Sequence, residues 1–376
     1  MARAYGNNRL MDAVQHSRFQ QRVAELRRPG TMTQGLRPMQ DRRNDFDVTD
    51  SVNVSQTTTV RDEVKALFAA VYPDYAFDRL WLAFYDFERL FTGRYPGFLG
   101  CDTSYHDRQH TLDMTLAMAR LIAGYEQSNE LARSLGAERA ELGIITSLFH
   151  DSGYIRHIER DRHFANGAEF TRWHVSRSAM FLAQYLPHIG LGENVLVARQ
   201  IVHFTGYEID LDQIELDDPR DSFLGHLLGT ADLMAQMADR CYLEKCRDRL
   251  YAEFVVGGVA VSDDDGAVEV RYASAEDLLR KTPGFVVESA FFRLDKVFGK
   301  AYRYVEALFG GRNPYLEWIE HNLAHLRQMV ADNDFGRLRR EPPVFVAEQG
   351  SLDTLNDLVS EVEHRHQASS GQPSTA

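Results

Sequence analysis

Apolar residues recur at helical spacing through most of the chain from Val60 to Asn333, and this pattern constrains the fold most strongly. Alternation of apolar and polar residues occurs over 257–274, where valines flank a DDDG turn and predict a small β-hairpin. We therefore expect an all-α helical bundle with an inserted hairpin. The pattern predicts helices over residues 60–72, 76–93, 105–125, 138–149, 173–186, 193–204, 222–254, 275–282, 291–309 and 315–333.

The two ends of the chain differ in composition from its middle. Residues 1–58 are rich in Arg without a single Lys, and we expect a basic, disordered or loosely helical extension there. Within it, residues 11–28 could form an amphipathic helix. Residues 59–340 are predicted to form the helical domain, and residues 341–376 a C-terminal segment with a disordered tail.

Composition excludes several classes of function. The 376 residues are 44% hydrophobic, which is enough for a large core, but the net charge of −13 argues against a general nucleic-acid binder. A small anionic substrate would need metal ions or local positive charge at its site to offset the repulsion from the protein's net negative charge. Three cysteines do not suggest a disulfide framework, and no segment resembles a membrane span or a secretion signal. We expect a cytoplasmic protein, whose oligomeric state is left open.

The adjacent pair His150-Asp151 follows the predicted helix 138–149, with Gly153 as a plausible helix terminator. An imidazole and a carboxylate at the partly negative C-terminal end of a helix are well placed to hold a cation. Such a pair alone is a weak signal, because His is common in cores and on surfaces.

Further metal-ligand residue types lie on other predicted helices. His106 and His110 are spaced i, i+4 and so share a helix face, with Asp113 three residues further along the same side. Each of these residues could also have a purely structural role, as a helix cap, a solvated residue or a member of a polar pair. For His226, in the predicted helix 222–254, we expect only such a structural role. Their order along the chain nevertheless indicates one site, because helical bundles build His-carboxylate metal sites from several helices. The set is completed by His174, His203 and Asp232.

The order His110, His150-Asp151, Asp232 resembles the HD superfamily of metal-dependent phosphohydrolases. The string YHDRQHTLDM, from Tyr105 to Met114, is similar to the Y-H-N-x-x-H-x-x-D-V signature of its cyclic-nucleotide phosphodiesterase branch. His174 and His203 resemble the additional histidines of the HD-GYP branch. Residues 152–154, Ser-Gly-Tyr, differ from the residues that come after the HD pair in either branch.

The resemblance implies a phosphohydrolase acting on a phosphodiester or nucleotide with one or two divalent ions. Zn, Mn, Fe, Co, Ni and Mg all remain candidates. Two ions about 3.5–4 Å apart would activate water and bind the phosphoryl oxygens of an in-line displacement. The catalytic residues would be His106, as general acid, and Asp151. The implied metal ligands are His110, His150, Asp151, His174, His203 and Asp232.

Asp113 is expected to orient a histidine from behind the site. Tyr154 and Arg156 are weaker candidates for substrate contact, since an Arg can bind a phosphate in bidentate fashion but is also a common surface residue. Aromatic residues of the C-terminal helices are candidates for the pocket wall, although such residues more often belong to the core. These are Phe285, Phe291, Phe292, Tyr302 and Tyr304.

Two alternatives stay open. Some HD-fold proteins use a similar ligand set in a mixed-valent di-iron oxygenase, which an iron-dependent EPR signal with oxygen uptake would identify. The chain could also be a non-catalytic module that senses a metal or a nucleotide. The presence of His106 argues against that last reading, because a purely structural site does not need a general acid.

Overall fold

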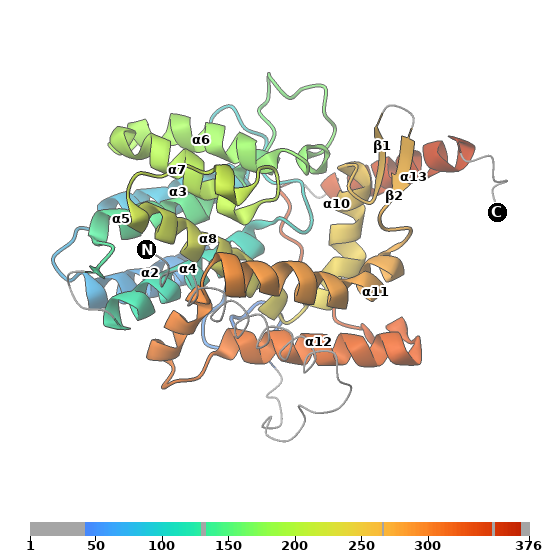
Figure 1. Cartoon of the computed structure of the whole chain (residues 1–376). Helices are drawn as coiled ribbons and strands as arrows, with labels where there is room; N and C mark the ends of the chain where they lie inside the picture. Colours follow the sequence, from blue (N-terminus) through green and yellow to red (C-terminus); the bar gives the residue numbers. More distant parts are fainter. Residues whose placement is uncertain (1–41, 129–132, 265–266, 348–349, 370–376) are drawn as a thin grey trace, which may run out of the picture.

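The computed structural model describes residues 42–128, 133–264, 267–347 and 350–369, which form an all-α fold with one two-stranded hairpin (Figure 1). This confirms the predicted fold class. The helices of the first half are α2 (Thr57–Val71), α3 (Asp78–Phe91), α4 (Arg108–Ser128), α5 (Ala137–Phe149), α6 (His174–His188) and α7 (Val195–Ile201). Those of the second half are α8 (Pro219–Ala238), α9 (Tyr242–Lys245), α10 (Tyr251–Val256), α11 (Ala275–Phe285), α12 (Pro314–Asp332) and α13 (Ser351–Ser369).

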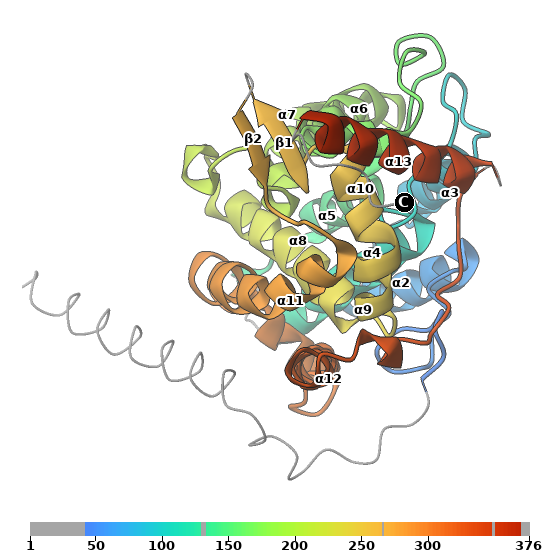
Figure 2. The ribbon, with the colours of Figure 1, turned by 90° about the vertical axis from the view of Figure 1, so that its right-hand side faces the viewer.

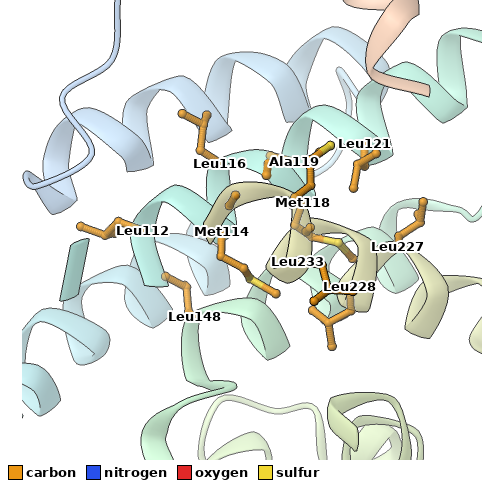
Figure 3. Close-up of a cluster of buried hydrophobic side chains, with 14 of the residues drawn as sticks. Leu112, Met114, Leu116, Met118, Ala119, Leu121, Leu148, Leu227, Leu228 and Leu233 are labelled. Atoms are coloured by element: carbon orange, nitrogen blue, oxygen red, sulfur yellow. The ribbon is translucent and has the colours of Figure 1, made fainter. Parts of the chain in front are cut away.

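Helix α4 lies at the centre and packs against α2, α5, α8 and the 3₁₀ segment η10 (Ala301–Leu308). Its residues from Gln109 to Gly124 are all buried, polar ones included, because these neighbours surround the helix. Apolar side chains of α4, α5 and α8, including Leu112, Leu148 and Leu228, form the core between these helices (Figure 3). Helices α4 and α8 thus form a rigid support for any site built at their ends.

Gly153 brings two segments of the future site together. It lies in the 3₁₀ turn η2 (Ser152–Tyr154) directly after α5, and a Cβ atom there would be 1.8 Å from the carbonyl oxygen of His174. The glycine is therefore required by the close approach of η2 to the start of α6. This contact places Asp151 next to His174.

The predicted helix 222–254 is broken in the structure. Helix α8 ends at Ala238, where Asp239 has a non-helical backbone, and α9, the π segment η7 (Cys246–Leu250) and α10 then follow as one continuous helical stretch. Side chains distant in sequence cap the end of α8: Arg42 donates to the oxygen of Ala238, and Asn322 donates to the oxygens of Met237 and Asp239. The predicted helix 291–309 is likewise broken, at Gly299 and Lys300, which both have positive φ angles.

The predicted hairpin is present. Strands β1 (Val261–Asp264) and β2 (Ala267–Val270) pair antiparallel, with Val261 opposite Val270. The hairpin projects at one side of the molecule, above α11 in the view of Figure 1.

The N-terminal boundary predicted at residue 58 is wrong for residues 42–58. Val48, Val52 and Val54 are buried, and buried Asp47 forms an ion pair with Arg120 of α4 at 2.7 Å. These contacts order a segment whose polar composition suggests a loose chain. Residues 1–41, with the predicted amphipathic helix over 11–28, lie outside the described residues.

The C-terminal segment contains a helix that periodicity did not predict. Helix α13 packs against α10 and crosses it in the view of Figure 2. The predicted disordered tail is therefore wrong for residues 365–369, which belong to α13, while residues 370–376 lie outside the described residues. Before α13, Arg249 of η7 donates to the backbone oxygens of Pro342 and Pro343 and, at 3.4 Å, of Ser104.

Candidate metal centre

His150 and Asp151 lie at the end of α5 and are 1% and 2% exposed. The His150 Nδ1 atom is 2.8 Å from the carbonyl oxygen of Ser147. Because a carbonyl only accepts, the ring proton is on Nδ1, and Nε2 presents its lone pair. This Nε2 lies 3.1 Å from Asp151 Oδ2, yet neither atom makes a hydrogen bond. Two buried polar atoms that converge without a partner are typical of a site built for a cation.

Helices α4 and α8 supply the other two donors. His110 Nε2 lies 3.4 Å from Asp151 Oδ2 and 3.3 Å from Asp232 Oδ1. Asp232 Oδ1 is also 3.8 Å from His150 Nε2. Donor atoms that share one ion at about 2.1 Å lie roughly 3 to 3.5 Å from one another, so His110, His150 and Asp151 could hold a metal ion, and Asp232 lies beside His110.

The electrostatics of the group agree with this geometry. Burial disfavours a charged His110, but the neighbouring carboxylates of Asp151 and Asp232 outweigh it and raise the His110 pKa to about 10. Burial likewise opposes charge on Asp151, yet the histidines beside it hold the Asp151 pKa well below its usual range. The carboxylates of Asp151 and Asp232 thus favour a positive charge between them, either a protonated imidazole or a bound cation.

His174, at the start of α6, faces the other oxygen of Asp151. Its Nε2 lies 3.8 Å from Asp151 Oδ1, and its Nδ1 is 2.8 Å from the carbonyl oxygen of Thr171, which again leaves the Nε2 lone pair available. A carboxylate with one oxygen beside His110 and His150 and the other beside His174 can bridge two ions.

The structure does not bring His203 into this group. His203 is half-buried in the 3₁₀ segment η5 (Val202–Thr205), and its Nδ1 atom is buried without a hydrogen-bond partner among the described residues. Within the described chain, His203 is absent from the cavity wall and makes no ion-pair contact with Asp151 or Asp232. A second ion would therefore have Asp151 and His174 as its protein ligands, with His203 outside.

His106 lies just before α4 and is held by a residue that the sequence did not indicate. Its Nδ1 is 2.6 Å from Glu253 Oε2 of α10, and the backbone N–H of Tyr105 donates to Glu253 Oε1 at 2.5 Å. Tyr154 stacks on the rings of both His106 and His174, with a centroid distance of 4.4 Å to each, and the two imidazole centroids are 5.9 Å apart. The structure therefore places His106 and Tyr154 next to the metal-ligand set.

Asp113 does not orient a histidine, so that prediction is wrong. It is buried and faces away from the cavity, and its pKa is raised to about 7 by burial and by Asp239 and Asp47, against the effect of Arg42 and Arg120. In the described residues it makes no hydrogen bond to a histidine. The histidine rings are oriented by other groups: the carbonyl of Ser147 orients His150, the carbonyl of Thr171 orients His174, and Glu253 orients His106.

The prediction that Arg156 contacts substrate is also wrong. Its guanidinium binds Asp102 at 2.7 and 2.8 Å and the carbonyl oxygen of Phe164 at 2.7 Å. All of these partners are structural, and Arg156 does not line the cavity.

The candidate ligands form one wall of a cavity of about 710 Å³. Of the aromatic residues predicted for its wall, only Phe285 lies there among the described lining residues, and the other four are elsewhere in the fold. Other aromatic side chains take their place: Tyr105, Tyr154, Tyr207, Tyr242, Phe254 and Tyr272.

No protein-family model, curated protein or solved structure matches the chain. None of the helices in the described ranges has both the length and the apolar character of a membrane span. The chemistry of the site therefore carries the functional argument.

Proposed function

We propose that the chain is a metal-dependent phosphohydrolase that cleaves a phosphodiester or nucleotide phosphate bond. The observation that carries the proposal is the convergence of His110, His150, Asp151 and Asp232 at separations of 3.1 to 3.8 Å on the wall of a large cavity. The order of these residues along the chain matches that of the HD phosphohydrolases. A cation there would supply the positive charge that a chain of net charge −13 needs to bind a phosphate.

Each residue has a distinct task in this proposal. His110, His150, Asp151 and Asp232 hold the first ion, and His174 with the second oxygen of Asp151 offers a place for another. When bound, the ion supplies Lewis acidity that polarises the phosphoryl group and lowers the pKa of water. The closed core behind α4 and α8 keeps the ligand side chains in one geometry.

His106 is the candidate proton donor to the leaving oxygen. Because its Nδ1 is bound to Glu253, the other ring nitrogen, Nε2, is the one available to a substrate. The fully buried carboxylate of Glu253 fixes the orientation of the ring through Nδ1, and the stacked Tyr154 fixes the ring plane. Cleavage of the ester bond then leaves the proton on the departing alcohol.

The test combines metal analysis with turnover. We expect protein purified without added metal to contain a divalent ion and to hydrolyse bis(4-nitrophenyl) phosphate after addition of Mn²⁺ or Zn²⁺. Asp151→Asn and Asp232→Asn should lower both metal content and turnover, the latter by more than about 100-fold. Asp74→Asn, at an exposed position, is the matched control and should change neither.

Two results would count against the proposal. Turnover that survives chelation and Asp151→Asn would place hydrolysis outside this site. Iron-dependent oxygen uptake with a mixed-valent EPR signal, without ester hydrolysis, would favour the oxygenase alternative instead.

A further inference from the structure

The cavity extends well beyond the metal-ligand group. Asp151 and Asp232 line one part of it, and Ser262, Glu269 and Arg271 of the hairpin region line another. A volume of about 710 Å³ is in the range of pockets that enclose whole organic ligands, and a phosphate group alone would leave most of it empty. The substrate is therefore bound by more than its reacting group.

Aromatic rings form much of the wall between these two parts. The rings of Phe254 and Tyr272 stack with their centroids 5.9 Å apart and an interplanar angle of 20°. Phe285 is 37% exposed and Tyr207 is 59% exposed, although both line the cavity. Exposed aromatic faces inside a cavity gain stability when a flat ring system covers them, which favours a ligand with an aromatic portion.

Arg271 provides a cation at the hairpin side. Its backbone is fixed, because its N–H donates to Ala260 O at 2.9 Å and its own carbonyl accepts from Lys281 Nζ at 2.7 Å. Its exposed guanidinium has no ion pair or hydrogen bond within the described residues, whereas Lys281 is also bound to Asp277 at 2.8 Å. A guanidinium with a fixed base and no partner among the described side chains, on the wall of a ligand cavity, is suited to bind an anionic group.

The remaining charges limit how much negative charge the ligand carries. Arg172 and Arg271 are the basic residues among the described residues that line the cavity, and Glu208 and Glu269 are acidic residues beyond the metal ligands. Glu208 already accepts from the N–H groups of Val175 and Ser176 at the start of α6. Glu269 lies two residues before Arg271, so its carboxylate repels a highly charged group such as a polyphosphate chain.

We infer that the substrate is a phosphodiester whose far end carries an aromatic ring system and one further anionic group, which Arg271 binds. This inference rests on the proposed function for the position of the reacting phosphate. It assigns the hairpin a role in substrate recognition.

Binding of matched dinucleotides tests the inference separately from turnover. The probes are two adenine dinucleotides with a non-hydrolysable methylenephosphonate linkage, one with and one without a 5′-phosphate. Calorimetry with full-length protein and added Mn²⁺ should show about 10-fold tighter binding of the phosphorylated probe, as one charge-assisted contact provides. Arg271→Gln should remove this preference, and Glu269→Gln should increase it.

Arg160→Gln is the control, since Arg160 is exposed and outside the cavity, and it should keep the wild-type preference. Equal binding of the two probes, no detectable binding of either, or a preference that survives Arg271→Gln would each overturn the inference. Failure of the proposed function would appear elsewhere, as absent metal-dependent hydrolysis of bis(4-nitrophenyl) phosphate.

Discussion

At the scale of single residues, the contact between His106 and Glu253 joins positions 147 apart in the sequence. We expect Glu253→Gln to slow hydrolysis of esters with poorly acidic leaving alcohols by about 10- to 100-fold, because the imidazole loses the carboxylate that orients Nε2 as proton donor. Esters of 4-nitrophenol need no proton donor and should be hydrolysed at nearly the wild-type rate.

His106→Ala is the companion variant and should show the same dependence on the leaving group. Steady-state rates on a series of phosphodiesters with leaving groups of graded acidity provide the measurement. A uniform loss on every ester, with unchanged dependence on the leaving group, would mean that the pair has a structural role only.

The titration of Asp113 should make the stability of the fold depend on pH. Burial first, and then the neighbouring charges of Asp239 and Asp47, raise its pKa to about 7 from an ordinary value of 3.8, so the folded protein binds a proton that the unfolded chain has lost. The free energy of unfolding should therefore fall as pH rises from about 4 to 7, at up to about 1.4 kcal/mol per unit of pKa difference. Asp113→Asn should remove this dependence, which urea unfolding of both proteins at pH 5 and pH 8 would measure.

Other buried carboxylates contribute to the same curve. Asp47 and Asp239 have lowered pKa values and act in the opposite direction, so the difference between variant and wild type is the informative quantity. Asp74→Asn should match wild type at both pH values. An Asp113→Asn curve that is parallel to the wild-type curve would show that Asp113 titrates normally.

At the scale of elements, the approach of η2 to α6 depends on Gly153. The Cβ atom of Gly153→Ala would overlap the His174 carbonyl, and moving α6 away should destabilise the fold by about 1 to 3 kcal/mol and weaken metal binding. Gly284→Ala in α11 has no atom within 4 Å of the new Cβ and should be neutral or slightly stabilising. Chemical unfolding and metal titration of both variants would measure the free energy of unfolding and the metal affinity. Equal values for Gly153→Ala and Gly284→Ala would contradict the role given to Gly153.

The elements also show what the sequence can and cannot reveal. Helical spacing was sufficient to predict α3, α4, α5 and α12, because each buries one face or is buried whole, and alternation about the DDDG turn was sufficient to predict the hairpin. The break after Ala238 could not be predicted, because Arg42 and Asn322 cap α8 from distant parts of the chain. Helix α13 could not be predicted either, because it packs on α10, which is distant in sequence.

The candidate site also contains residues that the sequence indicates and residues that it does not. The ordered set His110, His150-Asp151 and Asp232 stands out because these residue types are unusual at the ends or on the inward faces of apolar helices. Glu253 follows no local pattern, and only the turn of α10 away from α8 brings it to His106. The surroundings of Arg156 and Asp113 could not be predicted locally, because Arg156 pairs with the remote Asp102 and the charges around Asp113 come from the remote Asp239, Arg42 and Asp47.

At the scale of the whole molecule, a bound ion would connect α4, α5 and α8. Binding to the folded state alone should raise the free energy of unfolding by about 2.7 kcal/mol at free metal about 100 times the Kd. Thermal unfolding with Mn²⁺ or Zn²⁺ against chelator would show this as a higher midpoint. Asp232→Asn should abolish the shift and Asp74→Asn retain it; identical midpoints with and without metal in wild type would exclude an ion at this position.

The spacing of the four donors also has a consequence for biosynthesis. His110 emerges from the ribosome long before Asp232, 122 residues later (232 − 110), so α4 and α5 must begin to fold with their inward polar groups unmatched. If the site binds an ion as proposed, a chain that completes synthesis in a metal-poor cell keeps Asp151 and Asp232 in its interior with only histidines beside them. Such chains would open more often and be degraded sooner, so the amount of this protein would then follow the cell's supply of that metal.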